Sequence, residues 1–307
     1  MSAKTHPTNA LSGETGAGTL YTLLAACGFA AVSTFTLIAR KENVSLATIL
    51  TWRYTLGAVV MVTFVATRNY PRMRWPEALR YVALGGGGQA LLVGMALSSL
   101  NYIGAATTAF LFYTYPAWVT LVQTIRGAEP VTVRRMLALA LSFGGLAVIV
   151  GNPLAGTAGV SGPARTGIAL ALGAAMVYGM YIPLMQWMQK SHPVAVTSAY
   201  GKIGSAICFL LLALKDQSMT ATMPANAWMA IIALTLFSTV LPSVFFLMGL
   251  MRLGPVRTAI VSTVEPFLTT VLAAVVLGQA VAPNTLLGGA MIVAAVVVLQ
   301  FRRERIA

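Results

Sequence analysis

Apolar residues fill this chain in runs of about 20 residues, separated by short polar segments. A run of that length is sufficient for a helix that crosses a bilayer, and the chain contains ten of them. They are centred near Gly28, Leu56, Gly88, Tyr113, Leu141, Val177, Ser205, Phe237, Glu265 and Ala290. The pattern predicts an all-α membrane protein with ten transmembrane helices.

The run from Leu250 to Leu277 carries the most unusual polar residues. Glu265 lies near its middle and Pro266 follows directly, and hydrocarbon penalises both unless the protein interior receives them. Helical spacing places four polar side chains on one face, namely Thr258, Ser262, Glu265 and Thr269. We expect this stripe to face a cavity.

The same design occurs earlier in the chain at a constant offset of 150, which indicates an internal duplication. The matched pairs are Leu100 and Leu250, Gly104 and Gly254, Thr108 and Thr258, Ala109 and Ala259, Pro116 and Pro266, and Thr120 and Thr270. Five spans per copy is an odd number, so the second copy must cross the membrane in the opposite sense. Two inverted five-helix repeats are typical of transporters that work by alternating access.

The duplication sets the predicted organisation. We expect a disordered cytoplasmic tail over residues 1–17, a first repeat over 18–151, a linker over 152–166, a second repeat over 167–301, and a basic cytoplasmic tail over 302–307. Because one chain supplies both repeats, a monomer is sufficient. The glycine pairs Gly144–Gly145 and Gly288–Gly289, in the fifth and tenth spans, indicate a packing seam, and a dimer interface is a second interpretation of them.

Composition and charge support the membrane assignment. Hydrophobic residues make up 58% of the chain and charged residues 9%, which excludes an ordinary soluble surface. The net charge of +13 is concentrated at one end of the predicted spans. Few cations are expected at the other end, namely Arg40, Lys41, Arg165 and Lys215. The positive-inside rule therefore places both termini in the cytoplasm and gives the basic residues a role in topology and lipid contact, not in nucleic-acid binding.

The residues that enzymes and metal sites need are sparse. Cys27 and Cys208 lie within predicted spans, while His6 and His192 lie in the tail and in a loop. These positions indicate no disulfide, no metal site and no catalytic triad. Only one of the seven acidic residues, Glu265, lies within a span, so an enzyme of lipid chemistry is disfavoured and no cofactor is expected.

Arg53 and Lys202 are candidate charges inside the membrane. They match at an offset of 149, several residues within apolar sequence, where a cation needs an acid, a carbonyl, water or a substrate as its partner. Arg53 is closer to its helix end and could instead extend its charge to the interface. Lys202 shares a helix face with Ser198 and Ser205, which favours it as a binding residue.

Aromatic residues form the third set of candidates. The fourth span carries Phe112, Tyr113, Tyr115, Pro116 and Trp118 in place of the serine and glutamate of the ninth span, and the sixth span places Tyr178 and Tyr181 on one face. These rings are compatible with a substrate pocket and equally with ordinary packing between helices.

The third span of each repeat is expected to have a weakened backbone. One copy contains the run Gly85–Gly88 and the other contains Pro242. The glycine run lacks the lysine and the serine or threonine of a phosphate loop, so it is not a nucleotide site. A hinge and a tightly packed helix crossing are both open interpretations.

The segment ALSSLNYIGAATTAFLFYTYPAWVTLVQTIRGAEPVTVRR and its looser copy LMRLGPVRTAIVSTVEPFLTTVLAAVVLGQAVAP resemble the EamA-type branch of the drug/metabolite transporter superfamily. The shared elements are a small-residue start to the fourth helix, its central proline and an acidic turn, which is Glu129 here but Gln279 in the second copy. Within the branch the chain is most similar to bacterial exporters of amino acids, with the aromatic amino-acid exporter as structural reference. The resemblance implies the bacterial inner membrane as the location.

Together these features predict an exporter of amino acids and related small metabolites. We expect the substrate to contact Glu265, Lys202, Ser262 and the rings of Tyr113, Tyr115, Trp118, Tyr178 and Tyr181. Pro116, Pro266, Pro242, Gly85 and Gly88 are the expected gating or hinge residues. The alternative is a proton-coupled antiporter of drugs or cationic metabolites in which Glu265 carries the proton, and a purely structural pair between Glu265 and Lys202 or Arg53 is a third interpretation.

Overall fold

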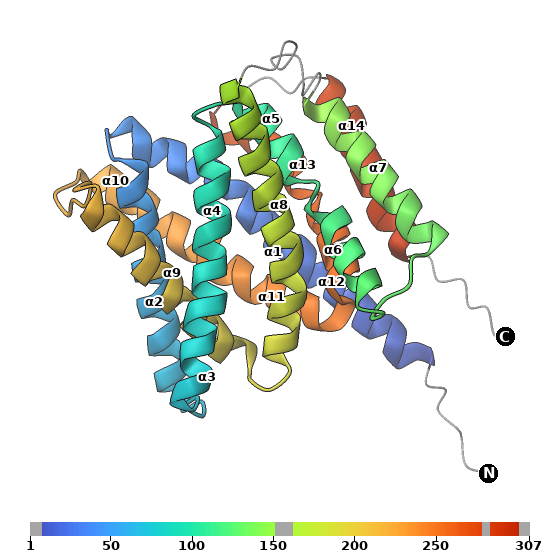
Figure 1. Cartoon of the computed structure of the whole chain (residues 1–307), viewed down its shortest axis with the longest axis horizontal. Helices are drawn as coiled ribbons and strands as arrows, with labels where there is room; N and C mark the ends of the chain where they lie inside the picture. Colours follow the sequence, from blue (N-terminus) through green and yellow to red (C-terminus); the bar gives the residue numbers. More distant parts are fainter. Residues whose placement is uncertain (1–7, 151–161, 278–282, 301–307) are drawn as a thin grey trace.

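The computed structural model describes residues 8–150, 162–277 and 283–300, and these residues form helices and turns without a strand (Figure 1). The helices are α1 (Thr8–Lys41), α2 (Leu46–Thr67), α3 (Trp75–Arg80), η1 (Tyr81–Gly86), α4 (Gly87–Ser99), α5 (Ala105–Phe112), α6 (Tyr115–Ile125), α7 (Val133–Val150), α8 (Gly162–Gln189), α9 (Val194–Lys215), α10 (Ala225–Thr235), η2 (Leu236–Val240), α11 (Leu241–Leu253), α12 (Pro255–Ser262), α13 (Glu265–Leu277) and α14 (Pro283–Gln300).

Within the described residues these segments form ten helical rods, because α3–η1–α4, α5–α6, α10–η2–α11 and α12–α13 each follow one path. Seven rods are long and apolar enough to cross a membrane, over Thr15–Lys41, Leu46–Thr67, Trp75–Ser99, Gly162–Gln189, Val194–Lys215, Ala225–Leu253 and Pro255–Val276. Helix α14 is apolar over the shorter range Pro283–Leu299. The predicted all-α membrane fold is confirmed.

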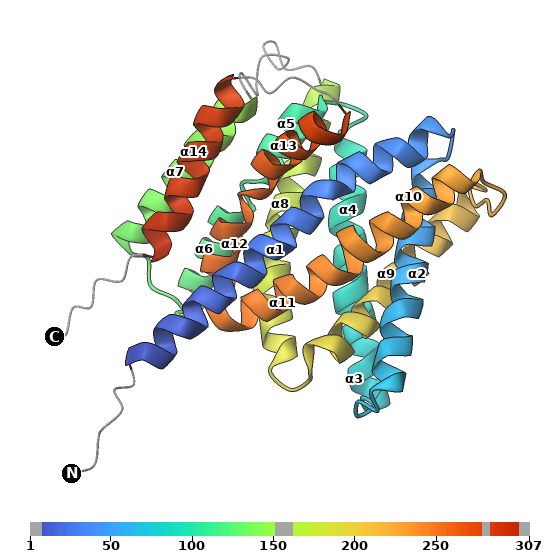
Figure 2. The same cartoon turned by 180° about the vertical axis from the view of Figure 1, so that it is seen from behind.

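Corresponding helices of the two halves pack in corresponding ways, as expected for inverted repeats. Helix α1 packs against α11 as α8 packs against α4, and α13 packs on α1 as α6 packs on α8. Equivalent pairs also meet one another: α2 lies against α9, and α7 and α14 lie side by side at one edge of the molecule (Figures 1 and 2). The same correspondence holds for single residues, since Gly18 abuts Leu253 and Gly167 abuts Ile103.

The fourth helix of each repeat is broken near its centre, which corrects the expectation of one continuous helix through Leu250–Leu277. Helix α11 ends at Leu253, and the next rod is interrupted between Ser262 and Glu265. The Thr263 hydroxyl donates to the Ile260 carbonyl at 2.6 Å at this break, and the Thr114 hydroxyl donates to the Leu111 carbonyl at 2.6 Å at the matching break. Pro116 and Pro266 follow the two breaks because the first turn of a helix tolerates a missing N–H.

The third rod of each repeat contains a π-helical stretch, η1 and η2. Gly85 and Gly86 lie in η1, and Pro242 lies just after η2 in the first turn of α11. A π-helical turn leaves carbonyl groups outside the regular α-helical ladder and is frequent at functional sites. Both third spans therefore depart from regular α-helix, at the glycine run in one repeat and just before Pro242 in the other.

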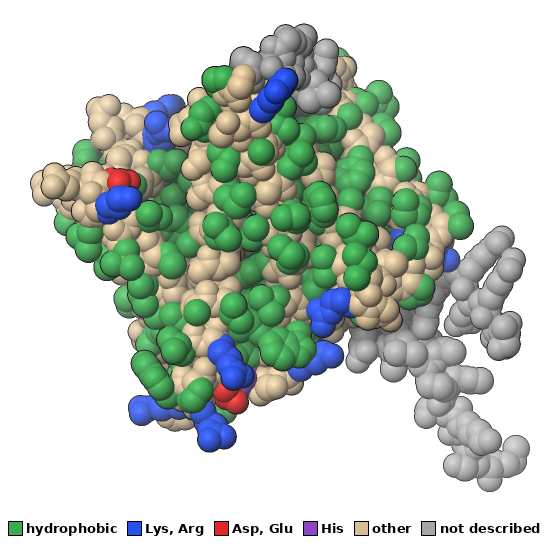
Figure 3. Space-filling view, viewed as in Figure 1, with side chains coloured by type: hydrophobic (Ala, Val, Ile, Leu, Met, Phe, Trp, Pro, Cys, Tyr) green, Lys and Arg blue, Asp and Glu red, His purple; other side chains and the backbone are tan. Residues whose placement is uncertain are grey.

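On the face shown in Figure 3, apolar side chains cover the middle, and lysine and arginine side chains gather toward the ends. Exposed apolar residues of the chain include Leu79, Leu211 and Leu286, which belong to three different rods. So large an exposed apolar surface is expected where lipid replaces water.

Several predicted boundaries differ from the helices. Helix α1 begins at Thr8, so residues 8–17, expected in a disordered tail, are helical, and α8 begins at Gly162 within the expected linker. Residue 151 at the end of the expected first repeat, residues 152–161 of the expected linker, the tail over 302–307 and the turn residue Gln279 lie outside the described residues.

Three of the four glycines predicted as a packing seam, Gly144, Gly145 and Gly288, lie where α7 and α14 meet, while Gly289 packs against Phe267 of α13. A Cβ atom on Gly145 would lie 2.5 Å from the Gly288 carbonyl oxygen, and one on Gly288 would lie 2.3 Å from the Gly145 carbonyl oxygen. The seam is therefore used inside the chain, between the two repeats.

Candidate functional site

Five aromatic rings from the break in the fourth rod and from α8 form one cluster. The ring centroids of Phe112 and Tyr178 lie 5.6 Å apart and stacked, and those of Tyr115 and Tyr178 lie 4.6 Å apart. Tyr113 joins through Tyr115 at 6.1 Å, and Tyr181 joins through Tyr178 at 6.3 Å. Phe112 ends α5 and Tyr115 begins α6, so the cluster includes rings from both sides of the break between these helices.

Glu265 meets this ring cluster from the opposite repeat. It is the first residue of α13, directly after the break in the ninth span, and its carboxylate is in hydrogen-bonding contact with the Tyr113 hydroxyl. Ser262, on the other side of the break, contacts the Tyr115 hydroxyl, which also donates to the Ala259 carbonyl at 3.3 Å. The two broken helices therefore meet through polar groups that the breaks bring together.

The Glu265 carboxylate has no ion-pair partner within 4.0 Å among the described residues. Arg53 interacts with it electrostatically from a longer distance. The direct structural pair with Lys202 or Arg53, one of the interpretations of this acid, is absent from the described part of the chain. Glu265 as a whole residue is half-buried among protein groups.

Arg53 donates hydrogen bonds to one side-chain and one backbone group of the other repeat. Its Nε donates to the Thr239 hydroxyl at 2.5 Å and its Nη2 donates to the Ser238 carbonyl at 3.2 Å, both within η2. The side chain is buried rather than extended to the interface. Arg53 thus satisfies groups that the π-helical turn exposes, and a charged donor makes such hydrogen bonds strong.

Lys202 occupies the position in the second repeat that matches Arg53, but its contacts are different. Its ammonium lies 5.5 Å from the centroid of the Tyr54 ring and makes no hydrogen bond or ion pair to any residue that the structure describes. The Tyr54 ring stacks on Phe209 at 4.9 Å, and the Gln89 amide donates to its hydroxyl at 3.4 Å. A half-buried ammonium without an acceptor is costly, and an anionic group would remove that cost.

Tyr54 lies beside both cations inside the membrane, Arg53 and Lys202. It lies within electrostatic range of Tyr178 and Tyr181, and the guanidinium of Arg53 lies 5.3 Å from its ring centroid. Glu265, the ring cluster, Tyr54 and Lys202 are therefore linked by ring contacts or by electrostatic range, and we call this set the central cluster. Sequence reasoning missed Tyr54, although its position directly after a membrane-embedded arginine was a usable signal.

The glycine run packs tightly at two of its four positions. A Cβ atom on Gly86 would lie 2.3 Å from the Gly204 Cα atom, and one on Gly88 would lie 2.8 Å from the Tyr181 ring. The Tyr181 hydroxyl donates to the Gly85 carbonyl at 2.8 Å. Close packing is therefore established for Gly86 and Gly88, while hinge motion at Gly85 and Gly88 stays a prediction.

The remaining predicted site residues lie at the margins of the central cluster. Trp118 packs with its Cβ atom close to Gly179 of α8, and its ring has no ring contact with the cluster within the described part of the chain. Pro242 packs against Gly28 of α1. Groups of three or more His, Cys, Asp or Glu side chains that could hold a metal ion are absent from residues 8–150, 162–277 and 283–300.

Comparison with known proteins identifies the family. The EamA-like transporter family matches the sequence twice, over residues 16–151 and over residues 165–301. The chain belongs to this family. Each match covers one of the two five-helix halves, so this EamA-like protein is a multi-pass membrane transporter and not an enzyme.

Two further likenesses agree with this identification. An uncharacterized transporter of Archaeoglobus fulgidus is 25% identical over 209 residues, which is 68% of this chain and 72% of that protein. A crystal structure of another protein superposes with a TM-score of 0.79 at 19% sequence identity, over 92% of this chain and 96% of the other. At that identity the superposition establishes the fold alone.

Proposed function

We propose that this EamA-like transporter exports amino acids and related small metabolites across the bacterial inner membrane, with both termini in the cytoplasm. The observation that carries the proposal is the pair of opposite charges in the central cluster: the Glu265 carboxylate and the Lys202 ammonium each lack an ion-pair partner within the described residues. A zwitterion supplies the complement of both, an ammonium for Glu265 and a carboxylate for Lys202.

The ring cluster supports the same class of substrate. Tyr113, Tyr115, Tyr178 and Tyr181 form one group of rings beside Glu265, and their hydroxyl groups stand at the edges of apolar faces. Such a lining accepts an apolar side chain and orients it with a few polar contacts. Ser262 adds a hydroxyl next to Tyr115, and Trp118 stands at the margin of the site.

Alternating access follows from the inverted repeats, which exchange conformations so that the site opens to one side at a time. We assign the bending to the broken fourth rods at Pro116 and Pro266 and to the third rods at Gly85, Gly88 and Pro242. Helices of the two repeats meet at the central cluster, so a change in one repeat alters the contacts of Glu265 with Tyr113. One chain supplies every group that this mechanism uses.

A second candidate is a proton-coupled antiporter for drugs or cationic metabolites. Its support is the aromatic surrounding of Glu265, because a carboxylate near several ring faces suits an organic cation. In that mechanism the proton and the cation compete for the carboxylate. The unpaired Lys202 ammonium favours the zwitterion, since it repels a purely cationic substrate.

Release of labelled amino acids from proteoliposomes tests the assignment of the site. Glu265→Gln and Lys202→Gln should each abolish amino-acid release while the purified proteins keep the thermal stability of the unaltered chain. Lys215→Gln, at the exposed end of the same helix α9, removes the same charge far from the central cluster and should leave release unchanged. Unaltered release by both site variants would eliminate the proposed site.

A further inference from the structure

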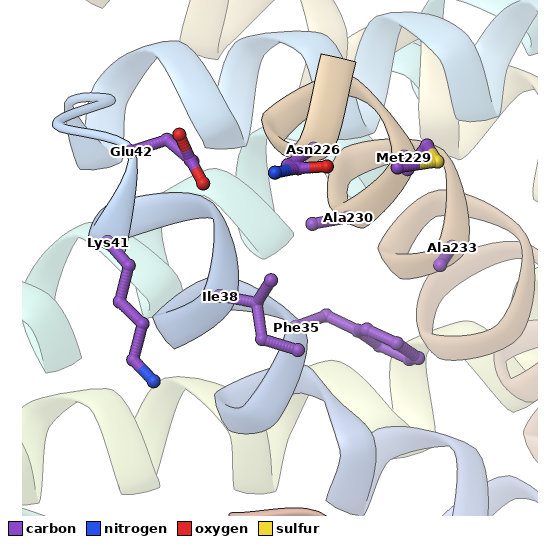
Figure 4. A pocket seen from close by; sticks show the side chains of 8 residues that line it. All are labelled: Phe35, Ile38, Lys41, Glu42, Asn226, Met229, Ala230 and Ala233. Carbon is purple, nitrogen blue, oxygen red and sulfur yellow. The ribbon is translucent and has the colours of Figure 1, made fainter. Parts of the chain in front are cut away.

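A groove lies between the end of α1 and the start of α10, away from the central cluster (Figure 4). It has a volume of about 400 Å³, and its lining is Phe35, Ile38, Lys41, Glu42, Asn226, Met229, Ala230 and Ala233. The apolar lining residues lie farther along α1 and α10, away from the helix ends. The charged and amide residues, Lys41, Glu42 and Asn226, lie where α1 ends and α10 begins. The groove thus has an apolar trough and a polar mouth.

The geometry of the two helices sets the depth of the trough. Phe35 precedes Lys41 by six residues on α1, which corresponds to a rise of about 9 Å. Ala233 follows Asn226 on α10 and bounds the trough at the same depth. The neighbouring side chains Leu37, Met229 and Phe237 are exposed and apolar, so the trough opens onto the surface that contacts hydrocarbon.

The polar side chains at the mouth do not pair with one another. Lys41 and Glu42 form no ion pair within the described residues, and the Asn226 side chain is exposed. In Figure 4 the Glu42 carboxylate and the Asn226 amide lie on opposite walls of the mouth, while the Lys41 ammonium points away from Glu42. The mouth therefore offers one positive and one negative group, separated in space, plus an amide.

We propose that this groove binds a bilayer phospholipid whose headgroup carries a phosphate next to a primary ammonium, that is, a phosphatidylethanolamine. An acyl chain occupies the trough between Phe35 and Ala233, and the phosphate is attracted by Lys41. The primary ammonium donates hydrogen bonds to the Glu42 carboxylate. A quaternary ammonium has no N–H to donate, and a glycerol headgroup carries no positive charge for Glu42.

This assignment is independent of the transported substrate. The groove lies at the helix ends, on the lipid side of α1 and α10, whereas the central cluster is built from α2, α5, α6, α8, α9 and α13. Loss of lipid binding and loss of amino-acid transport are therefore separable results.

Native mass spectrometry of the full chain tests the proposal. The protein is released from nanodiscs that contain equal amounts of phosphatidylethanolamine, phosphatidylglycerol and phosphatidylcholine with identical acyl chains, and the retained lipids are counted. We expect the ethanolamine lipid to be retained about tenfold over the choline lipid, the factor that one charge-assisted hydrogen bond supplies. Equal retention of the three lipids, or preferential retention of phosphatidylglycerol, would overturn the proposal.

Two variants separate the mouth from the trough. Glu42→Gln keeps the shape of the groove, so lipid should still be retained but without preference for the ethanolamine headgroup. Ala233→Phe fills the trough and should remove the retained lipid, while Ala290→Phe, the same change at an exposed position of α14, should not. Unchanged preference in Glu42→Gln contradicts the assignment even where Ala233→Phe fails to fold.

Discussion

The glycine run of the third rod permits a test in which neighbouring, chemically identical residues have opposite expected effects. A Cβ atom on Gly86 would lie 2.3 Å from both the Cα and the carbonyl carbon of Gly204, whereas ordinary van der Waals contact begins at 3.4 Å. Both Gly204 atoms belong to the backbone, so neither can move out of the way by a side-chain rotation. Gly86→Ala must therefore push η1 away from α9 by about 1 Å.

The expected cost of this displacement is about 1–3 kcal/mol, the usual range for overpacking a well-packed interior. The Ser205 hydroxyl, which donates to the Gly86 carbonyl at 3.5 Å, loses this contact as well. Because α9 also carries Lys202, the displacement moves a residue of the central cluster, and transport should fall together with stability.

Gly87→Ala is the matched control. A Cβ atom on Gly87 meets nothing within 4 Å, and the residue has the helical dihedral angles φ −63° and ψ −41°. Alanine should therefore be tolerated there and even stabilise the helix by up to about 1 kcal/mol. The melting temperature of each purified variant, followed in one detergent, and its transport rate are the two readouts.

The outcome also decides between packing and hinge interpretations of the run. If the run acts by close packing, Gly86→Ala lowers the melting temperature and Gly87→Ala does not. If it acts as a flexible hinge, Gly87→Ala slows transport at unchanged stability. Equal melting temperatures for the two variants would refute the packing argument.

The remaining predictions concern the paired cations and the seam between α7 and α14. Arg53→Gln should lower the melting temperature because it leaves the Thr239 hydroxyl and the adjacent carbonyl in η2 without their charged donor, at a cost of about 1–3 kcal/mol. Lys202→Gln should lose transport without any fall in the melting temperature, since its ammonium has no described acceptor; equal behaviour of the two variants in both assays contradicts the division of roles. Gly288→Ala should lower the melting temperature, because its Cβ atom would lie 2.3 Å from a carbonyl oxygen of α7, whereas Gly94→Ala, with nothing within 4 Å, should not.

The large-scale architecture was predictable because it depends on repeating features. Long apolar runs predict helices in a bilayer, and the offset of 150 between Pro116 and Pro266 predicts that local features recur. The structure places a break before each of these prolines and a threonine hydroxyl bond at each break. What the pattern did not predict was the break itself, because a proline is compatible with a kink, a break or a first helical turn.

The contacts of the central cluster were less predictable. Arg53 and Lys202 occupy matching positions, yet one binds η2 and the other faces Tyr54. That difference arises from partners nearly two hundred residues away in one case and about one hundred and fifty in the other, so no local pattern encodes it. Conversely, the sequence predicts Glu265 and Tyr113 in one site, and the structure brings these two side chains together.

The most direct test of the account is release of labelled threonine, methionine and phenylalanine from proteoliposomes that contain the purified protein, with and without an imposed pH gradient. The account predicts release of amino acids that requires both Glu265 and Lys202. Release without a gradient identifies transport that follows the concentration of the amino acid, and release only with the gradient identifies Glu265 as a proton site. If none of the three amino acids is released under either condition, amino-acid export is contradicted and cationic metabolites become the substrates to test.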